Sequence, residues 1–250
     1  MPFFRSLLLM LCCSSVQAGE LMVSAAASLN QAFTEIAREY ELTNPDTQVV
    51  LNFAASGLLL QQVAKGAPVD VLAVADQQTM DAAQQQKLIA EHTRADFAGN
   101  ALVLVVPKAS TIALNNLNDL QGKAISRIAI GNPDAVPAGR YAQSALETAG
   151  LWSVLQERLI STQNVRQALA YAAGNEVEAA FVYRSDISAA VDKVREVFEV
   201  PLQAPVLYPL ATVRSSQNQV EAQRFENFVR SSQGQKILRS HGFVPLDELP

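Results

Sequence analysis

The sequence predicts an α/β protein built as two lobes. Short apolar segments of strand length alternate along the chain with segments whose apolar residues recur at helical spacing. Several strand-like segments are apolar at every position, which is typical of parallel strands covered by helices on both faces of a sheet. The character of the chain changes after residue 106, toward the polar stretch 115–122, and changes back near 207–213. We therefore expect two crossings between the lobes, near residues 98–102 and 206–211.

The individual elements follow from these patterns. The helix expected at 165–173 is the clearest, because Val165, Ala168, Leu169 and Ala172 form one apolar stripe. Strands are expected at the apolar runs 21–26, 48–53, 69–74, 101–106, 127–130, 179–182 and 207–213. Helices are expected at the amphipathic segments 29–40, 58–65, 77–86, 140–149, 165–173 and 219–231.

The first 18 residues have the features of a secretory signal peptide. Arg5 provides a positive charge, residues 7–16 form an apolar stretch too short to span a membrane, and Val16-Gln-Ala18 fits a cleavage site. The mature chain is therefore expected to begin at Gly19, and its location to be the periplasm.

The cysteines and the charge limit what the mature chain can do. Cys12 and Cys13 both lie in the leader, so the mature protein has no thiol for a disulfide or a metal. A lipid anchor on either cysteine is the alternative, which the bulky Leu11 disfavours. Removing the leader leaves 18 basic and 24 acidic residues, a formal charge of −6 against −5 for the whole chain. Such an acidic surface argues against binding nucleic acid or anionic membranes.

The two crossings divide the chain after the signal peptide (1–18). We assign residues 19–100 and 209–250 to the first lobe and residues 101–208 to the second. Because the first lobe is made from both ends of the mature chain, a ligand is expected between the lobes. In open α/β sheets, ligands bind at the carboxyl ends of strands.

Two serines stand at predicted strand-to-helix turns. Ser28 and Ser56 each follow an apolar strand and small residues, and each precedes an amphipathic helix. Backbone N–H groups at a helix N-terminus are unpaired and the helix dipole is positive there, so such turns favour anions. Serine is also a favoured N-cap, and each serine alone could serve only that purpose.

Three further segments fit the same chemistry. Residues 131–141 run from a strand into a helix, and Pro137 and Gly139 bracket Ala138, whose N–H can approach a ligand closely. An N-cap at Asn164 would leave the N–H of Val165 free. Tyr183 ends a strand, where its hydroxyl is a natural donor, although a core tyrosine with a satisfied hydroxyl is the alternative.

In order and spacing these motifs resemble those of the periplasmic molybdate-binding proteins of ABC transporters. The resemblance covers residues 20–244 and is carried by residues 25–29, 53–56, 66–71, 75–76, 99–100, 132–139 and 182–186. It implies the two-lobed periplasmic-binding-protein fold of type II, in which each lobe is a mixed, mostly parallel sheet flanked by helices. It also implies a tetrahedral oxyanion in the cleft between the lobes.

The resemblance assigns the ligand contacts. Ser28 and Ser56 would donate through hydroxyl and backbone N–H, Ala138 and Val165 through backbone N–H, and Tyr183 through its hydroxyl. The implied function is the capture of molybdate, and also of tungstate, for delivery to an ABC-transporter permease. The resemblance implies a monomer with no catalytic residue and no cofactor, in which molybdenum enters only as molybdate, without a protein ligand to the metal.

The chain departs from the family pattern at three positions. Arg184 stands where glycine is common, Val74 where serine is frequent, and Ala55 where another small hydroxyl residue occurs. None of these changes removes an implied donor. Arg184 could lie at the cleft mouth and affect lobe closure.

A site made only of donors suits a fully deprotonated dianion, because every oxygen of molybdate or tungstate is an acceptor. Sulfate offers the same acceptors, so a binding protein for sulfate or another tetrahedral oxyanion is the main alternative. A secreted enzyme is a remote alternative, since the sequence has no Gly-x-Ser-x-Gly motif and its two histidines, His92 and His241, stand in polar, unrelated contexts. Asp70 and Asp76 are interpreted as turn and N-cap residues.

Overall fold

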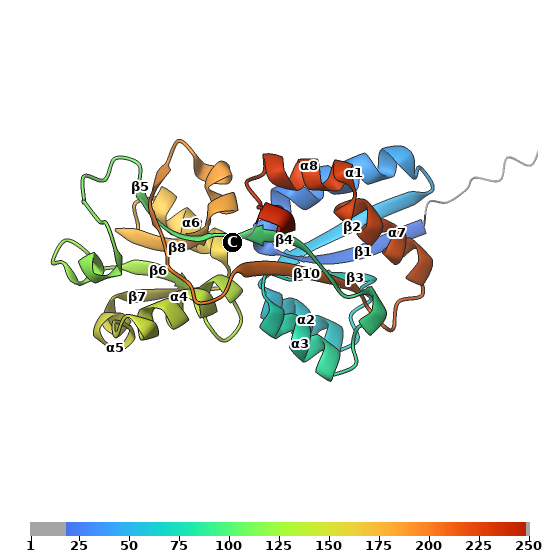
Figure 1. Cartoon of the computed structure of the whole chain (residues 1–250), viewed down its shortest axis with the longest axis horizontal. Helices are drawn as coiled ribbons and strands as arrows, with labels where there is room; N and C mark the ends of the chain where they lie inside the picture. The colour runs from blue at the N-terminus through green and yellow to red at the C-terminus, as the bar shows by residue number, and fades with distance from the viewer. Residues whose placement is uncertain (1–18, 249–250) are drawn as a thin grey trace, which may run out of the picture.

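The computed structural model of the chain describes residues 19–248 and has two lobes (Figure 1). The predicted leader, residues 1–18, lies outside the described residues. Each lobe is built on a five-stranded sheet with helices on both faces. The two-lobed α/β architecture predicted from the sequence is confirmed.

The sheet of the first lobe has the strand order β2-β1-β3-β10-β4. Its strands are β1 (Gly19–Ala26), β2 (Thr47–Ala54), β3 (Val71–Ala73), β4 (Ala95–Asn100) and β10 (Val206–Thr212). Its helices are α1 (Asn30–Thr43), α2 (Ser56–Ala64), α3 (Gln77–Gln85), α7 (Gln219–Arg230) and α8 (Ser232–Ser240). Both ends of the described chain therefore contribute to this lobe.

The sheet of the second lobe has the order β7-β6-β8-β5-β9. Its strands are β5 (Leu102–Pro107), β6 (Ile128–Gly131), β7 (Leu159–Thr162), β8 (Ala179–Tyr183) and β9 (Val194–Glu199). Its helices are α4 (Pro137–Thr148), α5 (Trp152–Leu155) and α6 (Val165–Ala173). Short 3-10 turns complete the fold: η1 (Ala27–Leu29), η2 (Glu91–Thr93), η3 (Leu117–Gln121), η4 (Gln156–Arg158), η5 (Arg184–Ala190) and η6 (Leu246–Glu248).

Both sheets are mixed in the same way. In the first lobe β1 pairs parallel with β2 and β3, whereas β10 pairs antiparallel with β3 and β4. In the second lobe β6 pairs parallel with β7 and β8, whereas β5 pairs antiparallel with β8 and β9. The parallel character expected from the apolar runs thus holds for half of each sheet. The strands next to the crossings form the antiparallel half.

The core explains why the strands are so apolar. Successive residues of a strand face opposite sides of the sheet, and in β3 Val71 and Ala73 join the main core, whereas Leu72 packs in a second core with Leu59 of α2 and Met80 of α3. Helices α1, α7 and α8 cover one face of this sheet, and α2 and α3 cover the other (Figure 1). A strand covered on both faces must be apolar at every position.

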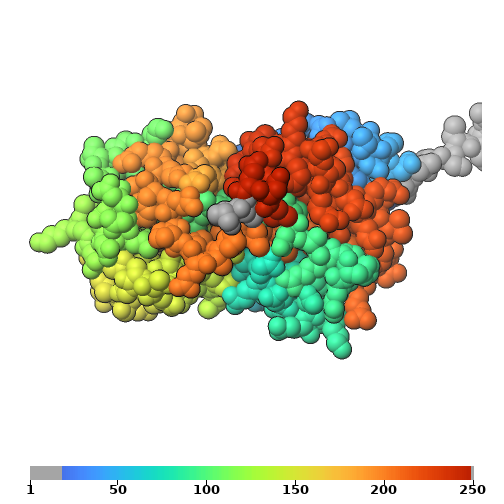
Figure 2. Space-filling view, in the orientation of Figure 1, coloured from blue at the N-terminus to red at the C-terminus, as the bar shows by residue number. Residues whose placement is uncertain are grey.

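The chain crosses between the lobes twice. Asn100 ends β4 and Leu102 begins β5, and the return runs from Glu199 in β9 to Val206 in β10. Figure 2 shows that atoms of the two lobes meet and that this returning segment lies across their junction. Residues 206–208, placed in the second lobe from the sequence, pair with β4 in the first. The strand continues past Pro209, where the register shifts to accommodate a residue without an N–H.

Several short or polar elements were not predicted. Strand β4 contains Gly99 and Asn100, which are depleted in strands, and β9 carries three charged residues among six. Helix α8 buries only Gly234, Ile237 and Leu238. Between residues 19 and 248, no helix is both long and apolar enough to cross a bilayer.

Candidate oxyanion site

A small cavity of about 10 Å³ lies between the lobes, at the carboxyl ends of β1 and β2 and of β8. Four of the five predicted ligand residues line this cavity: Ser28, Ser56, Val165 and Tyr183. The fifth, Ala138, follows Pro137, which also lines it, and is itself fully buried. The remaining lining residues are small or apolar apart from Asn164: Ala26, Ala27, Ala54, Ala55, Ala75 and Val136.

The two serines are buried and use their hydroxyls in tertiary contacts. Ser28 lies in η1, and its Oγ is 2.9 Å from the hydroxyl oxygen of Tyr208. Ser56 is the first residue of α2, and its Oγ accepts a hydrogen bond of 3.1 Å from the N–H of Ala75. Neither side chain caps a helix, since the N-cap is Ala26 for η1, Leu29 for α1 and Ala55 for α2. The alternative in which these serines serve only as N-caps is therefore wrong.

The second lobe contributes two helix N-termini and one strand end. Helix α4 begins at Pro137, and Ala138 follows in its first turn. Helix α6 begins at Val165, and the predicted N-cap at Asn164 is confirmed by a hydrogen bond of 3.0 Å from the N–H of Gln167. N–H groups in a first helical turn have no partner within the helix. These backbone donors therefore lie where the helices meet the cavity.

Tyr183 ends β8 and reaches the first lobe. Its hydroxyl donates a hydrogen bond of 3.4 Å to the carbonyl oxygen of Ala75. Burial raises the pKa of Tyr183 well above its ordinary value, so the hydroxyl keeps its proton and remains a donor. A hydrogen bond of this length is weak, and the proton can be redirected to a ligand in the cavity.

The electrostatics of the cavity favour an anion without a charged side chain. Helices α2, α4 and α6 begin at Ser56, Pro137 and Val165, which all line the cavity. Their positive dipole ends therefore converge there. None of the described lining residues is acidic or basic. Within residues 19–248, no group of three or more His, Cys, Asp or Glu side chains is arranged to hold a metal ion.

The lobes contact each other directly beside the cavity. The N–H of Gly57 in α2 donates a hydrogen bond of 2.9 Å to the carbonyl oxygen of Ala135 in the second lobe. A Cβ at position 57 would lie only 2.9 Å from both the Cα and the carbonyl oxygen of Ala135. Glycine is therefore required here for the close approach of the two backbones.

An ion pair also joins the lobes. Arg140 in α4 contacts Asp76, with Nη2 2.6 Å from Oδ2, and also donates to the hydroxyl of Thr79. Asp76 at the same time caps α3, as predicted, by accepting a hydrogen bond from the N–H of Thr79. The side chains of Asp76 and Arg140 are 6% and 18% exposed, so the pair is largely shielded from water.

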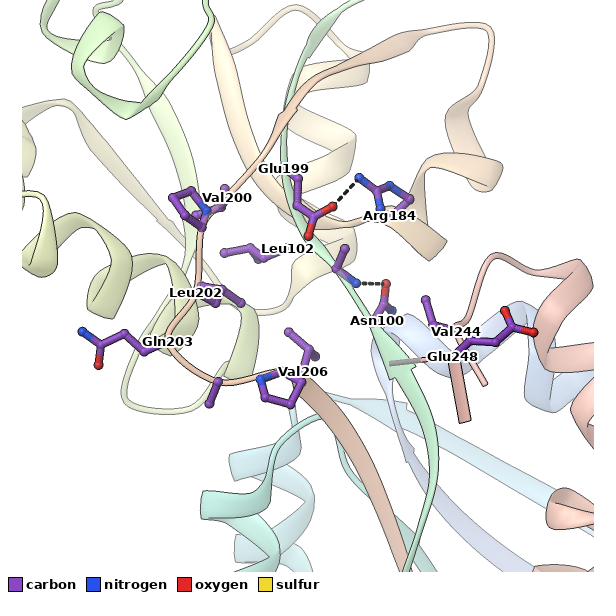
Figure 3. A pocket seen from close by; sticks show the side chains of 14 residues that line it. Asn100, Leu102, Arg184, Glu199, Val200, Leu202, Gln203, Val206, Val244 and Glu248 are labelled. Atoms are coloured by element: carbon purple, nitrogen blue, oxygen red, sulfur yellow. Dashed lines mark hydrogen bonds and ion pairs between the residues drawn. The ribbon is translucent and has the colours of Figure 1, made fainter. Parts of the chain in front are cut away.

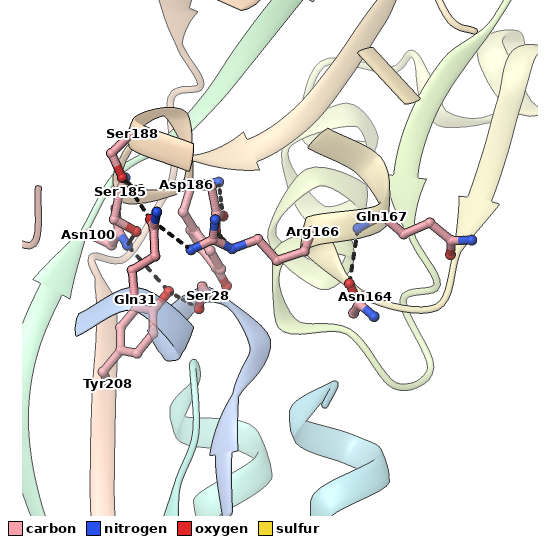
Figure 4. A network of polar contacts seen from close by, with 11 residues as sticks. Ser28, Gln31, Asn100, Asn164, Arg166, Gln167, Ser185, Asp186, Ser188 and Tyr208 are labelled. Atoms are coloured by element: carbon pink, nitrogen blue, oxygen red, sulfur yellow. Dashed lines mark hydrogen bonds and ion pairs between the residues drawn. The ribbon is translucent and has the colours of Figure 1, made fainter. Parts of the chain in front are cut away.

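A second buried pair lies behind the donors of the second lobe (Figure 4). The Nε atom of Arg166 is 2.9 Å from Oδ1 of Asp186, and Oδ2 of Asp186 accepts from the N–H of Tyr183. Burial raises the pKa of Asp186 to about 6, against the opposing effect of Arg166 and of the Tyr183 N–H. The pair fixes the start of α6 relative to the end of β8, and Arg166 also reaches Gln31 of the first lobe.

Arg184 does not line the oxyanion cavity. It donates to Glu196 and Glu199 of β9 and lines a separate depression at the crossings (Figure 3). That depression is lined by residues 100–102, 199–206, Arg184, Val244 and Glu248. The departure from the family pattern at position 184 therefore affects the crossing region, not the cavity wall.

Sequence reasoning missed several residues around the cavity. Gly57 could have been found, because a glycine in the first turn of an apolar helix suggests a close backbone approach. Arg140 stands three residues after Pro137, on the same side of α4. Tyr208 falls in the strand expected at 207–213, and β10 confirms that strand, but nothing in the sequence assigns Tyr208 to the site. For its contact with Ser28, 180 positions away, the sequence carries no signal.

Comparison with known proteins agrees with this geometry. Residues 21–244 match the family model described as bacterial extracellular solute-binding protein. The chain is 37% identical to the molybdate-binding protein ModA of Escherichia coli, with 90% of this chain and 89% of that protein covered. It is 33% identical to the molybdate-binding protein ModA of Haemophilus influenzae, with 92% of each covered.

Among solved structures, the sulfate-binding protein SubI from Mycobacterium tuberculosis superposes with a TM-score of 0.81 at 17% identity, covering 92% of this chain and 88% of that one. At that identity the likeness concerns the fold alone. The family model, in contrast, spans nearly all of the described residues. The chain therefore belongs to the family of bacterial extracellular solute-binding proteins.

Proposed function

We propose that this protein captures molybdate in the cavity between its lobes and delivers it to the membrane permease of an ABC transporter. The observation that carries the proposal is a cavity built from hydroxyls and helix N-termini, with no charged side chain among the described lining residues. Relatives that are 33–37% identical to this chain are named molybdate-binding proteins. Tungstate, with the same charge and shape, is the second expected ligand.

The arrangement explains how a dianion is held without a cationic side chain. The hydroxyls of Ser28, Ser56 and Tyr183 and the first-turn N–H groups at Ala138 and Val165 are all donors. A fully deprotonated oxyanion has only acceptors, so each of its oxygens can be satisfied. The helix dipoles lower the cost of removing the dianion from water. A protonated oxyanion would bring an O–H group, and the described lining offers no carboxylate to accept from it.

The contacts between the lobes support a binding cycle. Molybdate reaches the cavity when the lobes separate, and it is enclosed when Gly57 meets Ala135 and Arg140 meets Asp76. The protein acts as a carrier and not as an enzyme, since its proposed site contains donors but no base or nucleophile activated by a neighbour. It uses no cofactor.

The cellular setting follows from the leader. The chain is exported to the periplasm, its signal peptide is removed before Gly19, and the mature protein acts as a monomer. N-terminal sequencing of the exported protein tests the cleavage, and an acylated Cys12 or Cys13 at the N-terminus would contradict it. Light scattering of the purified protein tests the monomer.

Calorimetric titration with molybdate, tungstate, sulfate and phosphate tests the ligand. Molybdate and tungstate should bind tightly, and sulfate and phosphate much more weakly. At a hundredfold excess over Kd, a ligand stabilises the folded state by about 2.7 kcal/mol, so the melting temperature should rise clearly with the first two anions. Equal shifts with sulfate at equal concentration would favour the sulfate alternative.

A further inference from the structure

The hydroxyl of Ser28 is in contact with a tyrosine that does not line the cavity. Tyr208 lies in β10, directly after the second crossing, and its hydroxyl oxygen is 2.9 Å from Ser28 Oγ (Figure 4). Both side chains are buried, at 0% and 3% exposure. Either hydroxyl could be the donor in an isolated pair, so the direction of this hydrogen bond depends on a third group.

Asn100 is that third group. Its Oδ1 accepts a hydrogen bond of 2.9 Å from the N–H of Ala101, which fixes the orientation of the amide. Its Nδ2 therefore points the other way, 2.8 Å from Ser185 Oγ and 3.3 Å from the Tyr208 hydroxyl oxygen. An amide nitrogen donates and cannot accept. The oxygen of Tyr208 must therefore accept from Asn100.

Within residues 19–248, Ser28 Oγ is the remaining hydrogen-bond partner of the Tyr208 hydroxyl and accepts its proton. A phenol carries a single proton, and burial raises the pKa of Tyr208 well above its ordinary value, so the group keeps that proton. With its oxygen accepting from Asn100, Tyr208 donates to Ser28 Oγ. Ser28 therefore acts as the acceptor in this contact, and its own proton is free to point elsewhere.

The same outcome is reached at the other serine by a different donor. Ser56 Oγ accepts from the backbone N–H of Ala75, so its own proton is also left free. Both serines line the cavity. Each hydroxyl oxygen thus accepts from a protein donor, which leaves its own proton available to an anion.

We propose that Tyr208, itself oriented by Asn100, is a positioning residue that presents the Ser28 hydroxyl to the ligand as a donor. This inference rests on the proposed function. Tyr208 need not touch the anion. Its ring is fixed independently of its hydroxyl, by edge contacts with Phe97, Tyr183 and Phe243. The variant Tyr208→Phe therefore removes the hydroxyl and keeps the ring packing.

The test is a double-mutant cycle in molybdate affinity, measured by calorimetry. Tyr208→Phe should weaken binding about three- to tenfold, the worth of one ordinary hydrogen bond. Ser28→Ala should weaken it about ten- to a hundredfold, the worth of a bond to a charged ligand. In the Ser28→Ala background, Tyr208→Phe should change Kd less than twofold, because the hydroxyl it orients is gone. Melting temperatures confirm that each variant folds.

A second variant reverses the chain of hydrogen bonds. Asn100→Asp replaces the amide donor by an acceptor, so Tyr208 would donate to the new carboxylate and Ser28 would turn its proton toward Tyr208. Molybdate binding should weaken, and this loss should shrink when Ser28 is alanine. Tyr40→Phe is the matched control, because Tyr40 is also buried in the first lobe but its hydroxyl bonds to Glu221. Its Kd should equal that of the wild type.

The outcomes separate the two proposals. An unchanged Kd for Tyr208→Phe, or an equal loss in the presence and absence of the Ser28 hydroxyl, overturns the positioning role alone. A wild-type protein that binds none of the four anions overturns the proposed function and this inference with it. If Tyr208→Phe weakens molybdate binding only when residue 28 is serine, the result supports Tyr208 as the positioning residue.

Discussion

Replacing Gly57 by alanine should change stability and affinity in opposite directions. Gly57 is the second residue of α2, and alanine in place of glycine within a helix stabilises it by about 0.5–1 kcal/mol. When the lobes are apart, the new methyl group meets only solvent on that side. The melting temperature without ligand should therefore stay the same or rise.

Closure around the ligand should be harder in the same variant. The added Cβ would lie 2.9 Å from the Cα and the carbonyl oxygen of Ala135, well inside the roughly 3.5–4.0 Å of normal contact. Both atoms belong to the backbone and cannot rotate away. Separating them to normal contact stretches the 2.9 Å hydrogen bond between Gly57 and Ala135 beyond its useful range.

The cost combines overpacking of about 1–2 kcal/mol with the loss of one hydrogen bond of about 1 kcal/mol. Molybdate affinity should therefore fall roughly 30- to 150-fold. Calorimetry gives Kd, and thermal unfolding without ligand gives stability. Leu58→Ala is the control, since this neighbouring side chain in α2 is 45% exposed and its loss should leave Kd unchanged. A Gly57→Ala protein that binds molybdate like the wild type would refute closure through this contact.

Three further expectations concern charge. Ser28→Asp and Ser56→Asp each place a negative charge beside the bound dianion, and the repulsion costs roughly 4 kcal/mol per unit of ligand charge at about 4 Å and an effective dielectric of about 20. Each variant should therefore reduce molybdate affinity by at least two to three decades, and folded variants with the wild-type Kd would refute the assigned site. Arg140→Gln leaves the Asp76 carboxylate buried and unpaired when the lobes close, so the Kd for molybdate should rise about tenfold or more. Adding Asp76→Asn, which keeps the N-cap of α3, should restore much of the affinity. Equal affinities for the single and double variants would show that the ion pair does not contribute to closure. Burial raises the pKa of Glu226 to about 7 in the folded protein, against an ordinary value of 4.5. The folded state therefore binds more protons than the unfolded state between these two pKa values, and the free energy of unfolding should fall as pH rises from about 5 to 8. The melting temperature of Glu226→Gln should lack this part of the decline, and parallel pH profiles for the two proteins would contradict the expectation.

The sequence predicts most of what is local. The helix at residues 165–173 was placed with its bounds, because its apolar stripe, its N-cap Asn164 and the following Gly174 agree. The long apolar strands were found for the same reason. Strand β4 and helix α8 were not predicted, because their stability comes from packing against distant parts of the chain. The residues of β4 include poor strand formers, and those of α8 are largely polar.

The candidate site divides in the same way. Backbone donors at helix starts were predictable, since a strand followed by small residues and a helix places unpaired N–H groups in a known position. The contacts that orient these donors, or that close the lobes around them, were not predictable. Tyr208 reaches Ser28 from the far end of the chain, and Ala135 meets Gly57 from the other lobe. Such pairs depend on how the elements assemble, which no local pattern encodes.

The place of β10 in the first sheet determines when that lobe can be completed. β10 lies between β3 and β4 and pairs residues 210–212 with residues 71–73. Until residues 206–212 are present, the sheet is split into two parts that share no hydrogen bonds, although nearly all of the second lobe is already contained in residues 102–199. Contacts of such long sequence separation form slowly. A chain that crosses a membrane from its N-terminus would therefore finish its second lobe before its first.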